Sequence, residues 1–202
     1  MEKYKNSKVT HSLILICIAV YVISTLLYGL TMSAYDAIEF LGYNPLLVAI
    51  EHDYYRFITS NFIHFGIFHI VVNCYSLYNI GTFVEGILGV KDYSFVVVCS
   101  MISTTLLPYL LFLINGFGYN SVSGGISGVI CGLLGCIVAF ALVVKGEFQD
   151  VLKSLMPSII LMLVMSISLS DISLSGHLSG MFGGFVSSYL LLKYRTKKRI
   201  IN

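Results

Sequence analysis

Residues 123–135 read Ser-Gly-Gly-Ile-Ser-Gly-Val-Ile-Cys-Gly-Leu-Leu-Gly, and residues 175–184 read Ser-Gly-His-Leu-Ser-Gly-Met-Phe-Gly-Gly. In both segments glycine recurs every four residues: Gly124, Gly128 and Gly132 in the first, and Gly176, Gly180 and Gly184 in the second. Small residues at this spacing let helix backbones approach closely inside a membrane. The pattern therefore predicts two membrane helices that contact each other along their glycine ridges.

The whole chain has the composition of a membrane protein. Of its 202 residues, 57% are hydrophobic and 11% are charged, whereas a soluble domain carries about 25% charged residues. Long uncharged intervals separate the charges, and one span needs about 20 apolar residues. We predict one all-α domain, residues 1–202, built as a bundle of six membrane helices. The spans are placed at residues 11–30, 63–84, 93–114, 125–144, 153–170 and 175–193.

The basic residues predict the orientation of the chain. An even number of spans puts both termini on one side, and if that side is the cytoplasm, all 12 Lys and Arg residues except Arg56 lie inside. The positive-inside rule therefore favours an N-in, C-in topology. The basic C-terminal tail is typical of an anchor at anionic lipid rather than of nucleic-acid binding. No organelle transit peptide is apparent, so we expect the membrane of a bacterial cell.

The outer loop, residues 31–62, mixes acidic residues with aromatic and aliphatic ones. This composition suits a segment that lies in the membrane interface rather than free in water. The 5 cysteines all fall inside the predicted spans, without a CxxC pair or a Cys/His cluster. We therefore expect no disulfide framework, no metal site and no cofactor.

Polar side chains occur at membrane depth, where they are functional candidates. They are His64, His69, Asn73, Ser127 and His177. With the N-terminus inside, all of them fall in the outer half of the second, fourth and sixth spans. This common level indicates a water-filled cavity that opens to the outside.

Facing glycine ridges would bring Ser127 and His177 within hydrogen-bond reach, which is what an activated serine needs. Two carboxylates lie near the spans: Glu85 at the inner end of the second span, and Asp171 at the outer water interface. Because neither is well placed to orient His177, we expect a Ser–His dyad rather than a triad. Each residue alone also has a structural interpretation, since a serine in a span often bonds back to its own helix.

The motifs, taken together, resemble those of the rhomboid family of intramembrane serine proteases. The match lies in Arg56-x2-Thr59-x2-Phe62-x-His64-x4-His69-x3-Asn73-x7-Gly81-x3-Glu85, in Gly125-Ile126-Ser127-Gly128 and in Gly176-His177-x2-Gly180-x3-Gly184. The resemblance implies that Ser127 is the nucleophile and His177 the general base. It also implies an oxyanion hole made by the side chains of His69 and Asn73 and by the backbone N–H of Ser127.

The same resemblance gives supporting roles to other residues near the site. These are His64, Gly125, Gly128, Gly180, Arg56 and Glu85. The family commonly has alanine where this chain has Ile126, and the larger side chain raises the question of pocket size. The implied substrates are single-span membrane proteins with small residues and weak helicity near the outer face.

Two alternatives stay open. The first is a rhomboid-like protein without catalysis that binds membrane helices. The second is a transporter or channel in which the histidines and Asn73 line a polar path. A path should also carry polar groups in the inner half of the fourth and sixth spans, where the residues are leucine, valine, alanine and glycine.

Overall fold

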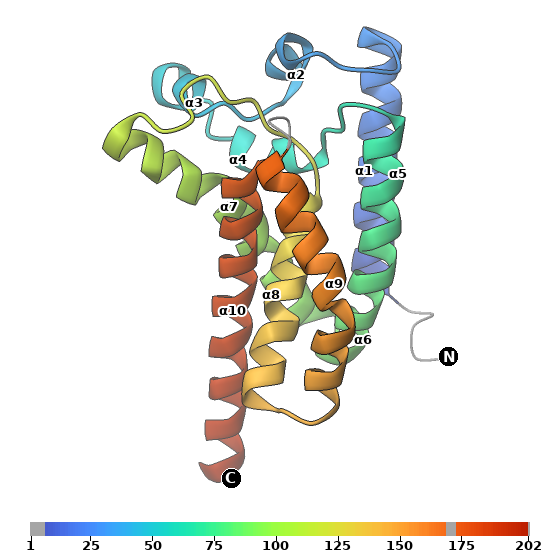
Figure 1. The fold of residues 1–202 in the computed structure, drawn as a ribbon, viewed down its shortest axis with the longest axis vertical. Coiled ribbons are helices and arrows are strands. Elements are labelled where there is room, and N and C mark those ends of the chain that lie inside the picture. Colours follow the sequence, from blue (N-terminus) through green and yellow to red (C-terminus); the bar gives the residue numbers. More distant parts are fainter. Residues whose placement is uncertain (1–6, 169–172, 202) are drawn as a thin grey trace.

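The fold was analysed in a computed structural model, which describes residues 7–168 and 173–201. Regular structure in these residues is helical, apart from one antiparallel bridge between Tyr43 and Ser123 (Figure 1). The helices are α1 (Lys8–Tyr28), α2 (Ala34–Phe40), α3 (Pro45–Glu51), α4 (Arg56–Thr59), η2 (Ser60–Phe62), α5 (Ile67–Ser76), η3 (Leu77–Gly81), α6 (Thr82–Leu88), α7 (Val90–Asn115), α8 (Ser127–Val143), α9 (Glu147–Ser168) and α10 (Leu174–Ile201).

Several of these helices are long and strongly apolar, as a membrane protein requires. Within the described residues, three segments have the length and hydropathy to cross a membrane: α1, the continuous segment Ile67–Leu88, and α7. Helix α8 is equally apolar but shorter, with 17 residues. The fifth and sixth predicted spans correspond to α9 and α10, whose charged residues lie in the first turns of α9 and the last turns of α10. The all-helical fold is thus confirmed, while the number of spans stays a prediction.

The second predicted span begins later than expected, at Ile67 rather than at residue 63. The reason is local, because Gly66 has an extended backbone with φ −179° and ψ 170°. The helix then continues through a π-helical turn, η3, into α6. Gly81 ends this turn against α1 and α7, where an added Cβ would lie 2.8 Å from the hydroxyl of Tyr93 and 2.9 Å from Cγ2 of Thr10.

The ends of the later helices also differ from the sequence prediction. Helix α8 begins at Ser127 rather than at residue 125, because Gly125 has φ +121° and cannot be helical. Helix α9 begins at Glu147, six residues before the predicted start. The predicted end of that span, residues 169–170, lies outside the described residues, as does Asp171.

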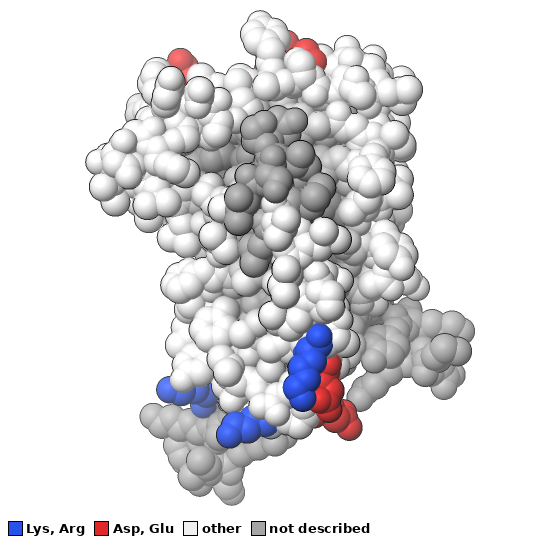
Figure 2. All heavy atoms as spheres, in the orientation of Figure 1, with Lys and Arg blue, Asp and Glu red and all other residues white. Residues whose placement is uncertain are grey.

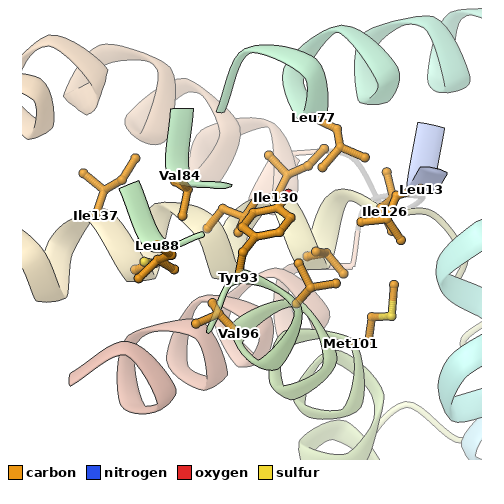
Figure 3. Packing of buried hydrophobic residues seen from close by; sticks show 14 of the residues in the cluster. Leu13, Leu77, Val84, Leu88, Tyr93, Val96, Met101, Ile126, Ile130 and Ile137 are labelled. Carbon is orange, nitrogen blue, oxygen red and sulfur yellow. The ribbon is translucent and has the colours of Figure 1, made fainter. Parts of the chain in front are cut away.

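Helix α8 forms the centre of the molecule, with α7 and α10 packed along it (Figure 1). Almost every residue from Gly128 to Ala141 is buried, which explains why this helix is apolar on all of its faces. The core cluster joins α8 to α1, α5, α6 and α7 (Figure 3). Among its members are Leu77, Val84, Tyr93, Val96, Ile126 and Ile130.

The two ends of the molecule differ in charge. On the face seen in Figure 2, lysine and arginine side chains gather at the end opposite α2 and α3. Near that end, Arg195 of α10 makes an ion pair with Asp92 of α7. This polarity agrees with the charge asymmetry from which the sidedness of the chain was predicted.

Candidate active site

The N-terminal ends of α8 and α10 bring Ser127 and His177 together. The distance between Ser127 Oγ and His177 Nε2 is 2.8 Å. His177 is 7% exposed, whereas Ser127 is only partly buried. When Nδ1 carries the imidazole proton, the Ser127 hydroxyl donates to Nε2, and this is the bond through which a base activates a serine. The pair can therefore form a nucleophile without any movement of either helix.

The glycine ridges of α8 and α10 make this contact possible, because their backbones interlock. A Cβ on Gly180 would collide with the carbonyl oxygen of Gly128, and a Cβ on Gly184 would collide with that of Gly132. A Cβ on Gly132 would in turn lie 3.0 Å from the carbonyl oxygen of Gly180. The predicted facing of the two ridges is thus found at these four glycines.

The outermost glycine of each ridge contacts another part of the molecule. Gly124 faces Ile63, whose Cβ lies 3.1 Å from an added Cβ, and Gly176 faces Ser173. The ridge contact therefore begins just below the dyad.

The outer loop holds the extended segment that leads into Ser127. Tyr43 and Ser123 exchange two backbone hydrogen bonds, each of 2.9 Å. The side-chain amide of Asn44 donates to the carbonyl oxygens of Tyr119 and Ser121, at 3.2 and 2.9 Å. These bonds fix the segment before α8 to Tyr43 and Asn44, which lie between α2 and α3.

Gly125 brings the segment before α8 against α5. Its N–H donates to the carbonyl oxygen of Ser60 at 2.9 Å, and its φ of +121° favours glycine. A Cβ at this position would lie 2.9 Å from His69 Nε2 and 3.6 Å from Asn73 Nδ2. A side chain on residue 125 would therefore crowd the ring of His69, whereas Asn73 Nδ2 would lie at ordinary contact distance.

His69 and Asn73 offer donors to the space beside Ser127. His69 Nδ1 accepts a long hydrogen bond, 3.4 Å, from the N–H of Phe65, so the ring proton resides on Nε2, the atom next to Gly125. The buried Nδ2 of Asn73 has no hydrogen-bond partner among the described residues. Because Ser127 is the first residue of α8, its N–H has no partner within the helix. His69 Nε2 and Asn73 Nδ2 thus lie together beside Gly125, two residues before the N–H of Ser127.

His64 is almost fully buried just before α5. Its Nδ1 lies 3.1 Å from the carbonyl oxygen of Phe62, and its ring packs edge-on against His69 with centroids 5.0 Å apart. His64 has no direct contact with the dyad in these interactions. The supporting role of His64 stays a prediction.

Arg56 stabilises the outer loop from inside. Its guanidinium donates to the carbonyl oxygens of Ile38 and Gly42, at 2.8 and 2.7 Å, and to Asp53 at 2.9 Å. The hydrogen bond and charge of Arg56 lower the pKa of the Asp53 carboxyl below its ordinary value. A buried arginine at 6% exposure therefore ties α2 to α4 and fixes the turn that pairs with Ser123.

Glu85 acts at the opposite end of the molecule, as the cap of α1. Its carboxylate accepts the N–H groups of Val9 and Thr10, at 3.0 and 2.9 Å, and the hydroxyl of Thr10 at 2.7 Å. A carboxylate at a helix N-terminus satisfies backbone donors that lack partners within the helix. Glu85 therefore caps α1, although the resemblance had placed it among the supporting residues near the site.

Ile126 has a fully buried side chain that belongs to the core cluster (Figure 3). The larger residue at this position therefore fills the protein core rather than the space above Ser127.

Sequence analysis missed the contribution of α7. Its hydroxyl side chains Ser100, Ser103 and Thr104 lie against the glycines of α8 and α10. The spacing of these residues, three and four apart, puts them on one helix face and was the available signal.

Comparison with known proteins agrees with the motifs. A model of the rhomboid domain matches residues 51–194. The rhomboid protease GluP of Bacillus subtilis (strain 168) is 25% identical over 193 residues, which cover 93% of this chain and 36% of that protein. Rhomboid-like protein 15 of Arabidopsis thaliana is 25% identical over 197 residues, covering 92% of this chain and 47% of that protein.

A further relative matches over most of its own length. The putative rhomboid protease YdcA of Bacillus subtilis is 28% identical over 159 residues, covering 78% of this chain and 76% of that protein. In contrast, the chain spans less than half of GluP and of Rhomboid-like protein 15.

Proposed function

The chain belongs to the rhomboid family, and on this premise we propose that it is a serine endopeptidase that cleaves transmembrane segments of membrane proteins near the outer membrane face. The observation that carries the proposal is the 2.8 Å separation of Ser127 Oγ and His177 Nε2. The N–H donors of His69, Asn73 and Ser127 support the same chemistry. Relatives named as rhomboid proteases, GluP and YdcA, support the reaction class.

In the proposed reaction, Ser127 Oγ attacks the scissile carbonyl carbon while His177 Nε2 accepts the hydroxyl proton. The electron pair of the carbonyl bond moves to its oxygen. The departing amine then takes the proton from His177 and leaves an acyl ester on Ser127. Water, which gives a proton to His177, attacks this ester and releases the new carboxyl end, and the proton returns to the serine.

The developing oxyanion is where the surrounding residues act. In this proposal the oxyanion accepts hydrogen bonds from the side chains of His69 and Asn73 and from the N–H of Ser127. Preorganised donors of this kind contribute about 3 kcal/mol each to the transition state. Gly125 keeps the site open to the substrate backbone, because any side chain there would occupy the space beside His69.

We further propose that α1, α5 to α6, α7, α8, α9 and α10 are six membrane spans with both termini in the cytoplasm of a bacterial cell. The substrate would be a single-span protein whose backbone becomes extended at the site. Small or helix-breaking residues near its outer end should aid cleavage, because glycine and proline lower the cost of unwinding a helix.

The test is cleavage of a model transmembrane substrate by the purified chain in lipid nanodiscs, with mass spectrometry of the products. The proposal predicts one cleavage site near the outer end of the substrate span, lost in Ser127→Ala and in His177→Ala. Binding of the substrate without cleavage by the wild type would instead favour the catalytically inactive helix binder. Proton or solute flux through liposomes that contain the chain would favour the transporter.

A further inference from the structure

Thr104 of α7 packs against glycines that adjoin Ser127 and His177 in the sequence. A Cβ on Gly128, the residue after Ser127, would collide with both branches of the Thr104 side chain. A Cβ on Gly180 would lie 2.7 Å from Thr104 Oγ1, and one on Gly176, the residue before His177, would lie 3.6 Å from Thr104 Cγ2. One side chain therefore contacts the backbones that carry both members of the dyad.

The conformation of Thr104 is fixed by its own helix. Its Oγ1 donates to the carbonyl oxygen of Ser100 at 2.8 Å. In a helix, this bond to the preceding turn selects one of the two rotamers that threonine can adopt. Since the hydroxyl is held by Ser100, the methyl group has a fixed direction between the glycines of α8 and α10.

The position of Thr104 differs from that of its neighbours on the same face. Ser100 packs against Gly132, and Ser103 packs against Gly183. Both contacts lie deeper along α8 and α10, where the glycine ridges touch each other directly. Thr104 packs against Gly128 and Gly180, the direct glycine contact nearest to Ser127 and His177, so its side chain fills the groove between α8 and α10 at that level.

We propose that Thr104 is a positioning residue that sets the separation of Ser127 and His177 by acting as a spacer between α8 and α10. The inference rests on the proposed proteolytic function. Its catalytic consequence is large, because a misplacement of about 1 Å between reacting groups can cost on the order of 100-fold in rate.

The experiment compares Thr104→Ala, Thr104→Val and the matched control Ser100→Ala in lipid nanodiscs. Ser100→Ala removes a hydroxyl from the same interface, bonded in the same way to its own helix at 2.7 Å, but one turn deeper. Thr104→Ala is expected to lower kcat by about 10-fold or more with KM nearly unchanged. Thr104→Val retains both branches and should keep most of kcat, whereas Ser100→Ala should keep kcat even if it lowers the melting temperature.

A second readout does not depend on activity. Nitrogen NMR of histidine-labelled chain reports the His177 ring, assigned with His177→Gln, and Thr104→Ala should shift this signal while Ser100→Ala does not. If the wild type cleaves no substrate but Thr104→Ala still shifts the His177 signal, the proposed function is refuted and the spacer role stands. Thr104→Ala with wild-type kcat and an unshifted His177 signal overturns the inference, as does an equal loss of kcat in both alanine variants.

Discussion

Gly180→Ala should separate α8 from α10 at the level of the dyad. In the structure, a Cβ on Gly180 would lie 2.8 Å from the carbonyl carbon of Gly128 and closer still to its oxygen. Carbon atoms in ordinary contact are about 3.5–4.0 Å apart. The backbones must therefore move apart by about 1 Å, because backbone atoms cannot rotate away as a side chain would.

This displacement has two measurable effects. Overpacking a close helix contact destabilises a protein by about 1–3 kcal/mol. A shift of about 1 Å between Ser127 and His177 is expected to lower kcat on the order of 100-fold. We expect KM to change little, since the substituted residue lies below the dyad and not beside the oxyanion donors.

The assay is steady-state cleavage of a transmembrane substrate together with thermal unfolding of the same samples. Gly66→Ala is the matched control, because its backbone is extended and the nearest atom to an added Cβ is 3.8 Å away. That variant should keep both activity and stability. Wild-type kcat in a well-folded Gly180→Ala would refute the argument that interlocked glycines set the geometry of the dyad.

Other parts of the site and the fold give further predictions. Asn73→Ala should lower kcat by about 100-fold or more at nearly constant KM, since it removes an oxyanion donor, while exposed Asn79→Ala in the same assay should not. Glu85→Gln should lower the free energy of unfolding by about 1.5–3 kcal/mol, because it replaces a carboxylate that accepts hydrogen bonds at 3% exposure. Thermal unfolding measures this loss. An unchanged melting temperature would contradict the role of Glu85 as the cap of α1. The hydrogen bond from Arg56 lowers the pKa of Asp53 in the folded chain. The ion pair therefore stabilises the outer loop fully at pH values above the pKa of an unfolded aspartate, about 4. This stabilisation is lost as the pH falls through the lower pKa of the folded chain. Limited proteolysis of the outer loop should show this acid sensitivity in the wild type but not in Asp53→Asn.

Much of the fold was predictable because charge and hydropathy act over whole helices. The uncharged intervals located each long helix to within a few residues at most ends. The glycine spacing identified which helices approach each other, and four of the six glycines make the expected contact. The uncharged intervals and the glycine spacing can both be recognised in the sequence without knowledge of any three-dimensional contact.

The remaining features depend on contacts between distant segments. The late start of α5 follows from the extended backbone at Gly66, and that of α8 from the positive φ of Gly125. The pairing of Tyr43 with Ser123 joins segments that are 80 residues apart. The placement of Thr104 between the ridges requires the crossing of three helices, which no local pattern defines.

The candidate residues illustrate the same division. Ser127 and His177 were identified by motif, and the structure adds their separation. The tautomer of His69, which directs Nε2–H toward Gly125, depends on the N–H of Phe65 and is apparent only in three dimensions. The direction of the Ile126 side chain, into the core, likewise could not be read from the motif.

The central claim is that Ser127 is a nucleophile activated by His177. The most direct measurement is covalent labelling of the purified chain by a fluorophosphonate, with the modified residue located by mass spectrometry. The account predicts a single adduct on Ser127 in the wild type, absent in Ser127→Ala and strongly slowed in His177→Ala although both variants remain folded. An adduct on another residue, or labelling of Ser127 at the wild-type rate in His177→Ala, would contradict it.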